Sequence, residues 1–191
     1  MKFLRYLFHM IPVLWYFIKD LVWERVSFEE IRTNYLFGKA HAFDDADLFE
    51  KAIGVYKTIM DQNPNSLPAL LGLGGIYFRR GRYDQAIQYY EKAIRKNPKH
   101  YLAHYWLAMC FWKLHRYHAA INTLEEVIGF LPTFKDALNL MGECYEKIGE
   151  GAKAEHCYLK AISVDPDGII LHRGIGNPQF QEKWEERRIK H

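Results

Sequence analysis

Apolar positions recur along most of the chain at steps of three and four residues, a pattern that predicts amphipathic helices. Residues 67–100 show two such runs, separated by the polar segment 79–82. The runs consist of Leu70, Leu73, Gly74 and Tyr77, and then Ala86, Ile87, Tyr90, Ala93 and Ile94. Gly81 is the expected left-handed residue after the first helix. Pro98 marks the end of the second helix, because the residue before a proline disfavours helical geometry. The segment is therefore predicted to be a helical hairpin.

The same pattern recurs with a fixed period. Prolines close each block at Pro64, Pro98, Pro132 and Pro166, which gives the equal blocks 33–66, 67–100, 101–134 and 135–168. The last block repeats the second one closely, with Leu138, Met141, Gly142, Tyr145, Ala154, Tyr158 and Ala161. The other two blocks match more loosely. One hairpin cannot bury its apolar face alone, so a fixed period of this length predicts hairpins that stack on one another.

Each block has the order large, Leu, Gly, aromatic, Ala, aromatic, Ala and Pro, with the two looser blocks departing from it at several positions. This order and the length of the block resemble the tetratricopeptide-repeat family, across residues 33–168. The resemblance implies an all-α fold: a right-handed superhelical solenoid of about four helix-turn-helix repeats within residues 27–168. It also implies a module that binds other proteins without catalysing a reaction.

The first 26 residues differ from the repeats by their many aromatic side chains. These are Phe3, Tyr6, Phe8, Trp15, Tyr16, Phe17 and Trp23. A helix here would have a wider apolar face than an ordinary surface helix. A membrane-associating helix over residues 1–25 is the favoured interpretation, with Trp and Tyr as interfacial anchors. Whether it spans a bilayer is open, because the apolar run from Tyr6 to Ile18 is shorter than the roughly 20 residues required.

Two other interpretations of this segment are open. A helix that caps the first repeat would cover the exposed end of the solenoid. A cleaved signal peptide is the least favoured, because no cleavage site with small residues follows the apolar run.

Sequence signals also mark both boundaries of the repeat region. Ser27 and Glu30 have the spacing of a capping box, which predicts a new helix from about Phe28. After Gly168 the pattern stops, and residues 169–191 are predicted to form a loop and a C-terminal capping helix that begins near residue 178. A tail that docks on a partner is the alternative for this helix.

Composition and motifs indicate no catalytic or metal chemistry. The chain has 191 residues, 49% hydrophobic and 26% charged, and a net charge of +3, which is too small to indicate nucleic-acid binding. Nine histidines form no HExxH motif, and no GxSxG motif or phosphate loop occurs. His100 and His104 have helical i, i+4 spacing, but no ligand set for zinc is completed nearby. We therefore expect no enzyme activity, no metal and no cofactor.

The three cysteines, Cys110, Cys144 and Cys157, form no CxxC pair. They are predicted to be buried core residues, because free cysteine behaves as a small hydrophobe. An odd number of buried thiols favours a reducing compartment.

The resemblance also implies a binding surface, because positions 2, 5, 9, 12 and 13 of each repeat in this family face a concave groove. The candidate groove residues are Phe37, His41, Leu71, Phe78, Arg79, Tyr105, Met109, Trp112, Lys113, Asn139 and Glu143. The same positions also hold Asn34, Asp44, Asp45, Gly75, Leu102, Asp136, Glu146 and Lys147. The middle of this set is apolar and its ends are acidic, so the expected partner is an apolar helix or peptide with basic flanks. Phe78, Tyr105 and Trp112 are the expected anchors. The alternative is that some of these side chains pack between repeats.

The favoured function is a membrane-associated scaffold or assembly factor, with its repeat domain on the cytoplasmic side. A permanent small accessory subunit of a membrane protein complex is one alternative. A soluble adaptor that self-associates into a homo-oligomer is another.

Overall fold

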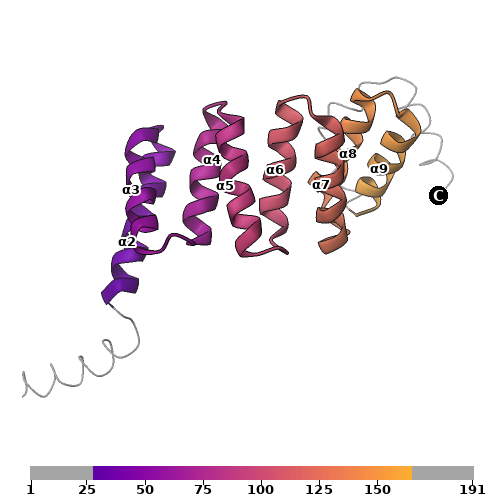
Figure 1. Ribbon diagram of the computed structural model, residues 1–191. Coiled ribbons are helices and arrows are strands. Elements are labelled where there is room, and N and C mark those ends of the chain that lie inside the picture. The colour runs from indigo at the N-terminus through magenta and orange to yellow at the C-terminus, as the bar shows by residue number, and fades with distance from the viewer. Residues whose placement is uncertain (1–27, 165–191) are drawn as a thin grey trace, which may run out of the picture. The chain divides into compact units, whose positions relative to one another are not determined.

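The computed structural model describes residues 28–164, and this part of the chain consists of eight α-helices in consecutive pairs (Figure 1). The predicted all-α fold of paired helices is confirmed. The expectations for residues 1–26 and 169–191 lie outside the described residues. The chain divides into two units, Met1–Pro64 and Asn65–His191, and each is described by itself.

The described part of the first unit is a single helix pair. Helix α2 (Phe28–Asp45) packs on α3 (Phe49–Gln62). Tyr56 of α3 is fully buried, and the rings of Phe37 and His41 on α2 lie 6.3 Å and 6.2 Å from its ring. Both groove candidates of this pair are therefore close to the tyrosine at its centre.

The second unit contains three helix pairs. They are α4 (Leu67–Arg79) with α5 (Tyr83–Lys96), α6 (Tyr101–Lys113) with α7 (Tyr117–Phe130), and α8 (Lys135–Lys147) with α9 (Gly151–Val164). Helix α5 also packs on α6, and α7 packs on α8, so each pair buries its apolar residues against the next. Ala108, Leu124 and Val127 from the second of these pairs share a buried cluster with Ala137 and Cys144 from the third.

The turn inside each pair contains one residue with a positive φ angle. These residues are Asp47 (57°), Gly81 (71°), His115 (58°) and Gly149 (83°), at the same position of each successive repeat. The left-handed geometry predicted at Gly81 is confirmed. Asp47 and His115 adopt this conformation although they carry a Cβ atom, which costs roughly 1–2 kcal/mol.

Two glycines set the distance between the helices of their pairs. A Cβ atom at Gly74 would lie 2.6 Å from Cε1 of Tyr90, and one at Gly142 would lie 2.5 Å from Cε1 of Tyr158. Such distances are far inside van der Waals contact. The glycine in the first helix therefore makes the space that the tyrosine of the second helix fills.

The three thiols are free and buried, as the sequence predicts. Burial raises the pKa of Cys110 to about 12, with a smaller contribution from Asp84. Burial likewise raises the pKa of Cys144 to about 12, with smaller contributions from Glu143 and Cys157. These thiols remain protonated at neutral pH and are poor nucleophiles.

Candidate functional site: a pocket between α6 and α8

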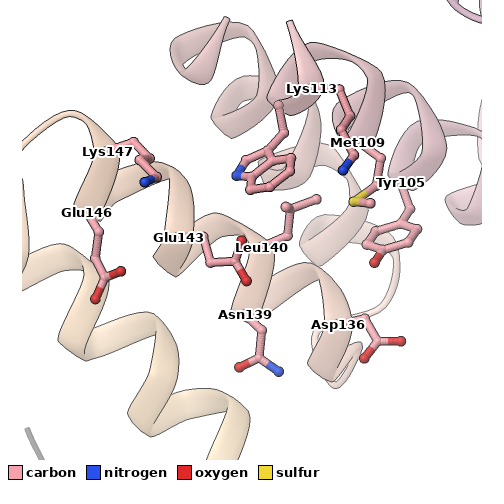
Figure 2. Close-up of a pocket in the computed structure, with 10 residues that line it drawn as sticks. Tyr105, Met109, Lys113, Asp136, Asn139, Leu140, Glu143, Glu146 and Lys147 are labelled. Atoms are coloured by element: carbon pink, nitrogen blue, oxygen red, sulfur yellow. The ribbon is translucent and has the colours of Figure 1, made fainter. Parts of the chain in front are cut away.

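A pocket of about 550 Å³ opens between the first helices of two successive pairs, α6 and α8 (Figure 2). Helix α6 contributes Tyr105, Met109, Trp112 and Lys113, and α8 contributes Asp136, Asn139, Leu140, Glu143, Glu146 and Lys147. On each helix these residues follow one another at steps of one, three and four, so they form one stripe. Helix α7 packs on both α6 and α8, which leaves the two stripes facing a common space.

The floor of the pocket is apolar. Leu140 is only 6% exposed, and Met109 and Trp112 are half-buried against the same core cluster. Nζ of Lys113 lies 4.9 Å from the centre of the Trp112 ring, a cation–π contact at the end of the pocket formed by the C-terminal turns of α6 and α8. The indole Nε1 of Trp112 is shielded from solvent and has no hydrogen-bond partner among the described residues.

The other end of the pocket is acidic. Burial raises the pKa of Tyr105 to about 12, and the negative charges of Asp136 and Glu143 contribute to this rise. Both carboxylates therefore lie close enough to Tyr105 to disfavour a further negative charge there. The amide of Asn139, which is 6% exposed, lies on the same helix between these two residues.

Edge-to-face ring contacts continue from the pocket across the three pairs of the second unit. We call these rings the aromatic ladder: Tyr83, Phe78, Trp106, Tyr105, Phe134 and Tyr101, with successive centroids 5.4, 5.4, 5.6, 5.1 and 5.4 Å apart. Trp106 contacts the pair before it and Tyr105 contacts the residue that precedes α8. Trp106 and Tyr101 are each 37% exposed, so the ladder also presents aromatic surface to solvent.

The structure brings about half of the sequence candidates together. Those that line the pocket are Tyr105, Met109, Trp112, Lys113, Asn139 and Glu143. Leu71 and Arg79 of α4 do not line it, and Phe37 and His41 belong to the first unit. Phe78 packs against Trp106, as the alternative of packing between repeats predicts. Its ring is therefore part of the ladder rather than of the pocket.

Sequence reasoning missed four aromatic or apolar residues here: Leu140, Trp106, Tyr101 and Phe134. Leu140 is buried in the core cluster and also lines the floor of the pocket. The adjacent aromatics Tyr105 and Trp106 were the available signal for the ladder. Two neighbouring residues on a helix point about 100° apart, so their rings reach different partners, Phe134 for Tyr105 and Phe78 for Trp106.

The histidine pair has a structural role. His104 is 4% exposed, with Nε2 2.9 Å from the carbonyl oxygen of Pro98 and Nδ1 3.0 Å from Oε2 of Glu126. Nδ1 of His100 accepts the backbone N–H of Ala103 at 3.1 Å and so caps α6. Within residues 28–164, His, Cys, Asp and Glu side chains form no group of three that could hold a metal ion. In the same residues no helix is both long and apolar enough to cross a bilayer.

Comparisons with known proteins agree with the repeat pattern. Residues 32–127, about half of the chain, match the family "Anaphase-promoting complex, cyclosome, subunit 3", and residues 135–167 match the tetratricopeptide repeat. No curated protein matches the chain in sequence.

Solved structures with the same fold include two crystal structures of MamA, each with a TM-score of 0.66. One is 28% identical and aligns over 70% of this chain and 73% of its own. The other is 26% identical and aligns over 80% of this chain and 97% of its own. A tetratricopeptide repeat protein from Parabacteroides merdae ATCC 43184 has a TM-score of 0.67 over 72% of this chain and 55% of its own, and its 22% identity shows the fold alone.

The helix pairs, the regular spacing of their turns and the family matches lead to one conclusion. The chain belongs to the tetratricopeptide-repeat proteins, a family of non-catalytic modules that bind other proteins.

Proposed function

We propose that this protein is a membrane-associated scaffold or assembly factor that binds an apolar segment of a partner protein in the pocket between α6 and α8. The pocket is the observation that carries the proposal. It combines an apolar floor of Met109, Trp112 and Leu140 with charged groups at its rim. Buried apolar area gives affinity in such a site, and a few placed polar groups give orientation.

A helix or an extended peptide fits this site better than a small molecule does. The stripe extends over about two turns of α6 and three turns of α8, and the aromatic ladder continues from Tyr105 to the exposed ring of Trp106. Large aromatic side chains are the usual anchors of protein interfaces. The partner segment therefore has a continuous apolar path from the pocket to the surface of α6.

The membrane part of the proposal rests on the sequence of residues 1–26. Their seven aromatic side chains and apolar run are typical of a segment that enters a membrane interface. The cytoplasmic side is proposed for the repeat domain, because three buried free thiols suit a reducing compartment.

Site-specific photocrosslinking tests the pocket. A benzophenone amino acid replaces Met109 in the pocket, and in a matched control it replaces Asn122, which is exposed on α7 of the same pair. We expect one discrete crosslinked product from Met109 and none from Asn122 in the native membrane fraction. Equal products from both positions, or none from Met109, would contradict the proposed site.

Vesicle flotation tests the membrane part separately. The full chain and a variant that begins at Ser27 are mixed with phospholipid vesicles, with and without high salt. We expect only the full chain to float, in both conditions, because an apolar segment is not released by salt. A full chain that stays in solution would rule out the membrane part and favour a capping helix or an oligomer interface.

A further inference from the structure

The two ends of the pocket carry opposite charge. Figure 2 shows Asp136 and Asn139 at one end of the α8 stripe, Lys147 at the other, and Leu140 with Glu143 between them, while Lys113 comes from the last turn of α6. Helices α6 and α8 present their N-terminal turns at the acidic end and their C-terminal turns at the basic end.

Negative charge extends from the acidic end, at Asp136, to Glu143 in the middle of the pocket. The negative charges of Asp136 and Glu143 both act on the hydroxyl of Tyr105, whose pKa lies at about 12. A cationic side chain placed there would have two carboxylates and an aromatic ring as neighbours. Both kinds of group stabilise a cation.

The basic end carries two lysines, Lys113 and Lys147, and one carboxylate, that of Glu146. The carboxylate of Glu146 acts on the hydroxyl of Tyr158 of α9 and helps to raise its pKa, and Figure 2 shows this carboxylate directed away from the other labelled side chains. The ammonium of Lys113 lies over the Trp112 ring. A second cation here would meet Lys113 and Lys147 and would be repelled.

We propose that the pocket binds a polar-ended segment with one orientation: a Lys or Arg side chain lies between Asp136 and Glu143, an apolar stretch contacts Met109 and Leu140, and an acidic group lies at Lys113 and Lys147. This rests on the proposed function and narrows it, because the partner then has one basic flank rather than two. Asp136 and Lys147 are separated by about three turns of α8, or roughly 16 Å along its axis. An extended segment covers that distance in about five residues.

Capped fluorescent hexapeptides provide the probe. Their apolar core is Leu-Ala-Ala-Leu, and their ends carry Lys and Glu, Lys and Lys, or Glu and Glu. Binding to the full-length protein is measured by fluorescence anisotropy at low and high salt. Each of the other two peptides places one of its ends beside groups of like charge, so one exposed ion pair is replaced by a repulsion. We therefore expect the mixed peptide to bind about five-fold more tightly than either of them at low salt. The preference should shrink at high salt.

Charge-neutral variants then assign each preference to one end. In the double variant Asp136→Asn with Glu143→Gln, the mixed peptide should no longer bind more tightly than the Glu/Glu peptide. It should still bind more tightly than the Lys/Lys peptide. In the double variant Lys113→Gln with Lys147→Gln, the mixed peptide should lose its advantage over the Lys/Lys peptide and keep its advantage over the Glu/Glu peptide. If a double variant fails to fold, Asp136→Asn and Lys147→Gln alone, both at exposed residues, give the same separation at smaller amplitude.

The matched control changes net charge without touching the pocket. Glu91→Gln with Glu125→Gln alters two exposed carboxylates outside the pocket, and it should leave both preferences unchanged. The proposal is overturned if the three peptides bind equally, if none binds, or if the control shifts the preferences as much as the pocket variants do. Equal binding that is lost in Met109→Glu would overturn the orientation while leaving the apolar site of the proposed function in place.

Discussion

The ring of Tyr90 on α5 packs against Gly74 on α4, so close that a Cβ atom at Gly74 would lie 2.6 Å from Cε1 of the ring. The next pair has the alternative combination, with Ala108 and Leu124 at the equivalent positions, both fully buried. The third pair returns to glycine and tyrosine, with Gly142 and Tyr158. A small residue and a large one are therefore matched within each pair.

The first prediction concerns this match. Gly74→Ala should lower the free energy of unfolding by about 1–2 kcal/mol, because the steric cost exceeds the gain in helix propensity. Tyr90→Leu alone should also be destabilising, through the cavity that it leaves. The double variant should be more stable than the sum of the two changes predicts, because it reproduces the pairing of Ala108 with Leu124. Strictly additive costs in urea unfolding would show that the two sites do not interact.

The second prediction concerns the turn of the α6–α7 pair. His115→Gly should raise the free energy of unfolding by about 0.5–1 kcal/mol, since φ at His115 is 58°. The gain is partly offset by loss of the 2.7 Å contact between Nδ1 of His115 and the hydroxyl of Tyr117, which is exposed. Gly81→Ala, at the equivalent turn, should cost about 1 kcal/mol. A lower urea midpoint for His115→Gly would contradict this account.

The third prediction concerns the buried imidazole of His104. His104→Leu should cost about 1–3 kcal/mol, because the carbonyl of Pro98 would lose its donor. Glu126→Gln should cost less, because Glu126 is exposed and its amide can still hydrogen-bond. His118→Ala, at an exposed site on α7, serves as the control and should change stability by less than about 0.5 kcal/mol. A neutral effect of His104→Leu would show that this contact contributes nothing.

The fourth prediction is a loss of stability in alkali. The thiols of Cys110 and Cys144 have pKa values of about 12 in the folded chain, against an ordinary value of 9.0 in the unfolded chain. Above pH 9 the unfolded chain therefore binds fewer protons than the folded chain, so stability falls as pH rises from 9 towards 12. Each thiol should contribute a loss of about 1 kcal/mol between pH 9 and pH 10.

Urea midpoints at pH 7, 8, 9 and 10 measure this effect. They should be nearly constant up to pH 8 and then fall, and Cys110→Ala with Cys144→Ala should make the fall shallower. The same two thiols should react with a soluble alkylating reagent only after unfolding. Rapid alkylation of the native chain at pH 8 would disagree with the pKa values.

Much of this architecture could be predicted from sequence because its causes are local and recur in every repeat. Gly81 ends α4 in a left-handed conformation, and Gly74 faces the ring of Tyr90 as a small residue opposite a large one. The family positions carried over to Tyr105 and Asn139 fall on facing stripes, because helices of equal length in successive pairs keep the same rotation. Whether those residues bind a partner remains a prediction.

Other features depend on contacts between helices that no local pattern encodes. The partner of His104 is Glu126, on the following helix α7, and the pairing depends on how α6 and α7 are rotated about their axes. Phe78 occupies a groove position by sequence but contacts Trp106, because a large ring in the next pair fills the space in front of it. The distribution of charge along the pocket also depends on the directions of the Glu143 and Glu146 side chains, and no local sequence pattern encodes these directions.

We expect the aromatic ladder to limit local unfolding within the second unit. Stacked repeats contact only their neighbours, so such a unit can lose its outer helices while the rest stays folded. Trp106 and Tyr105 on α6 hold Phe78 on one side and Phe134 on the other. Opening that starts at α4 or at α9 should therefore end at the middle pair, and the backbone amides of α6 and α7 should be the last in the second unit to exchange with deuterium. The binding pocket would then have one stable wall, on α6, and one that opens more readily, on α8.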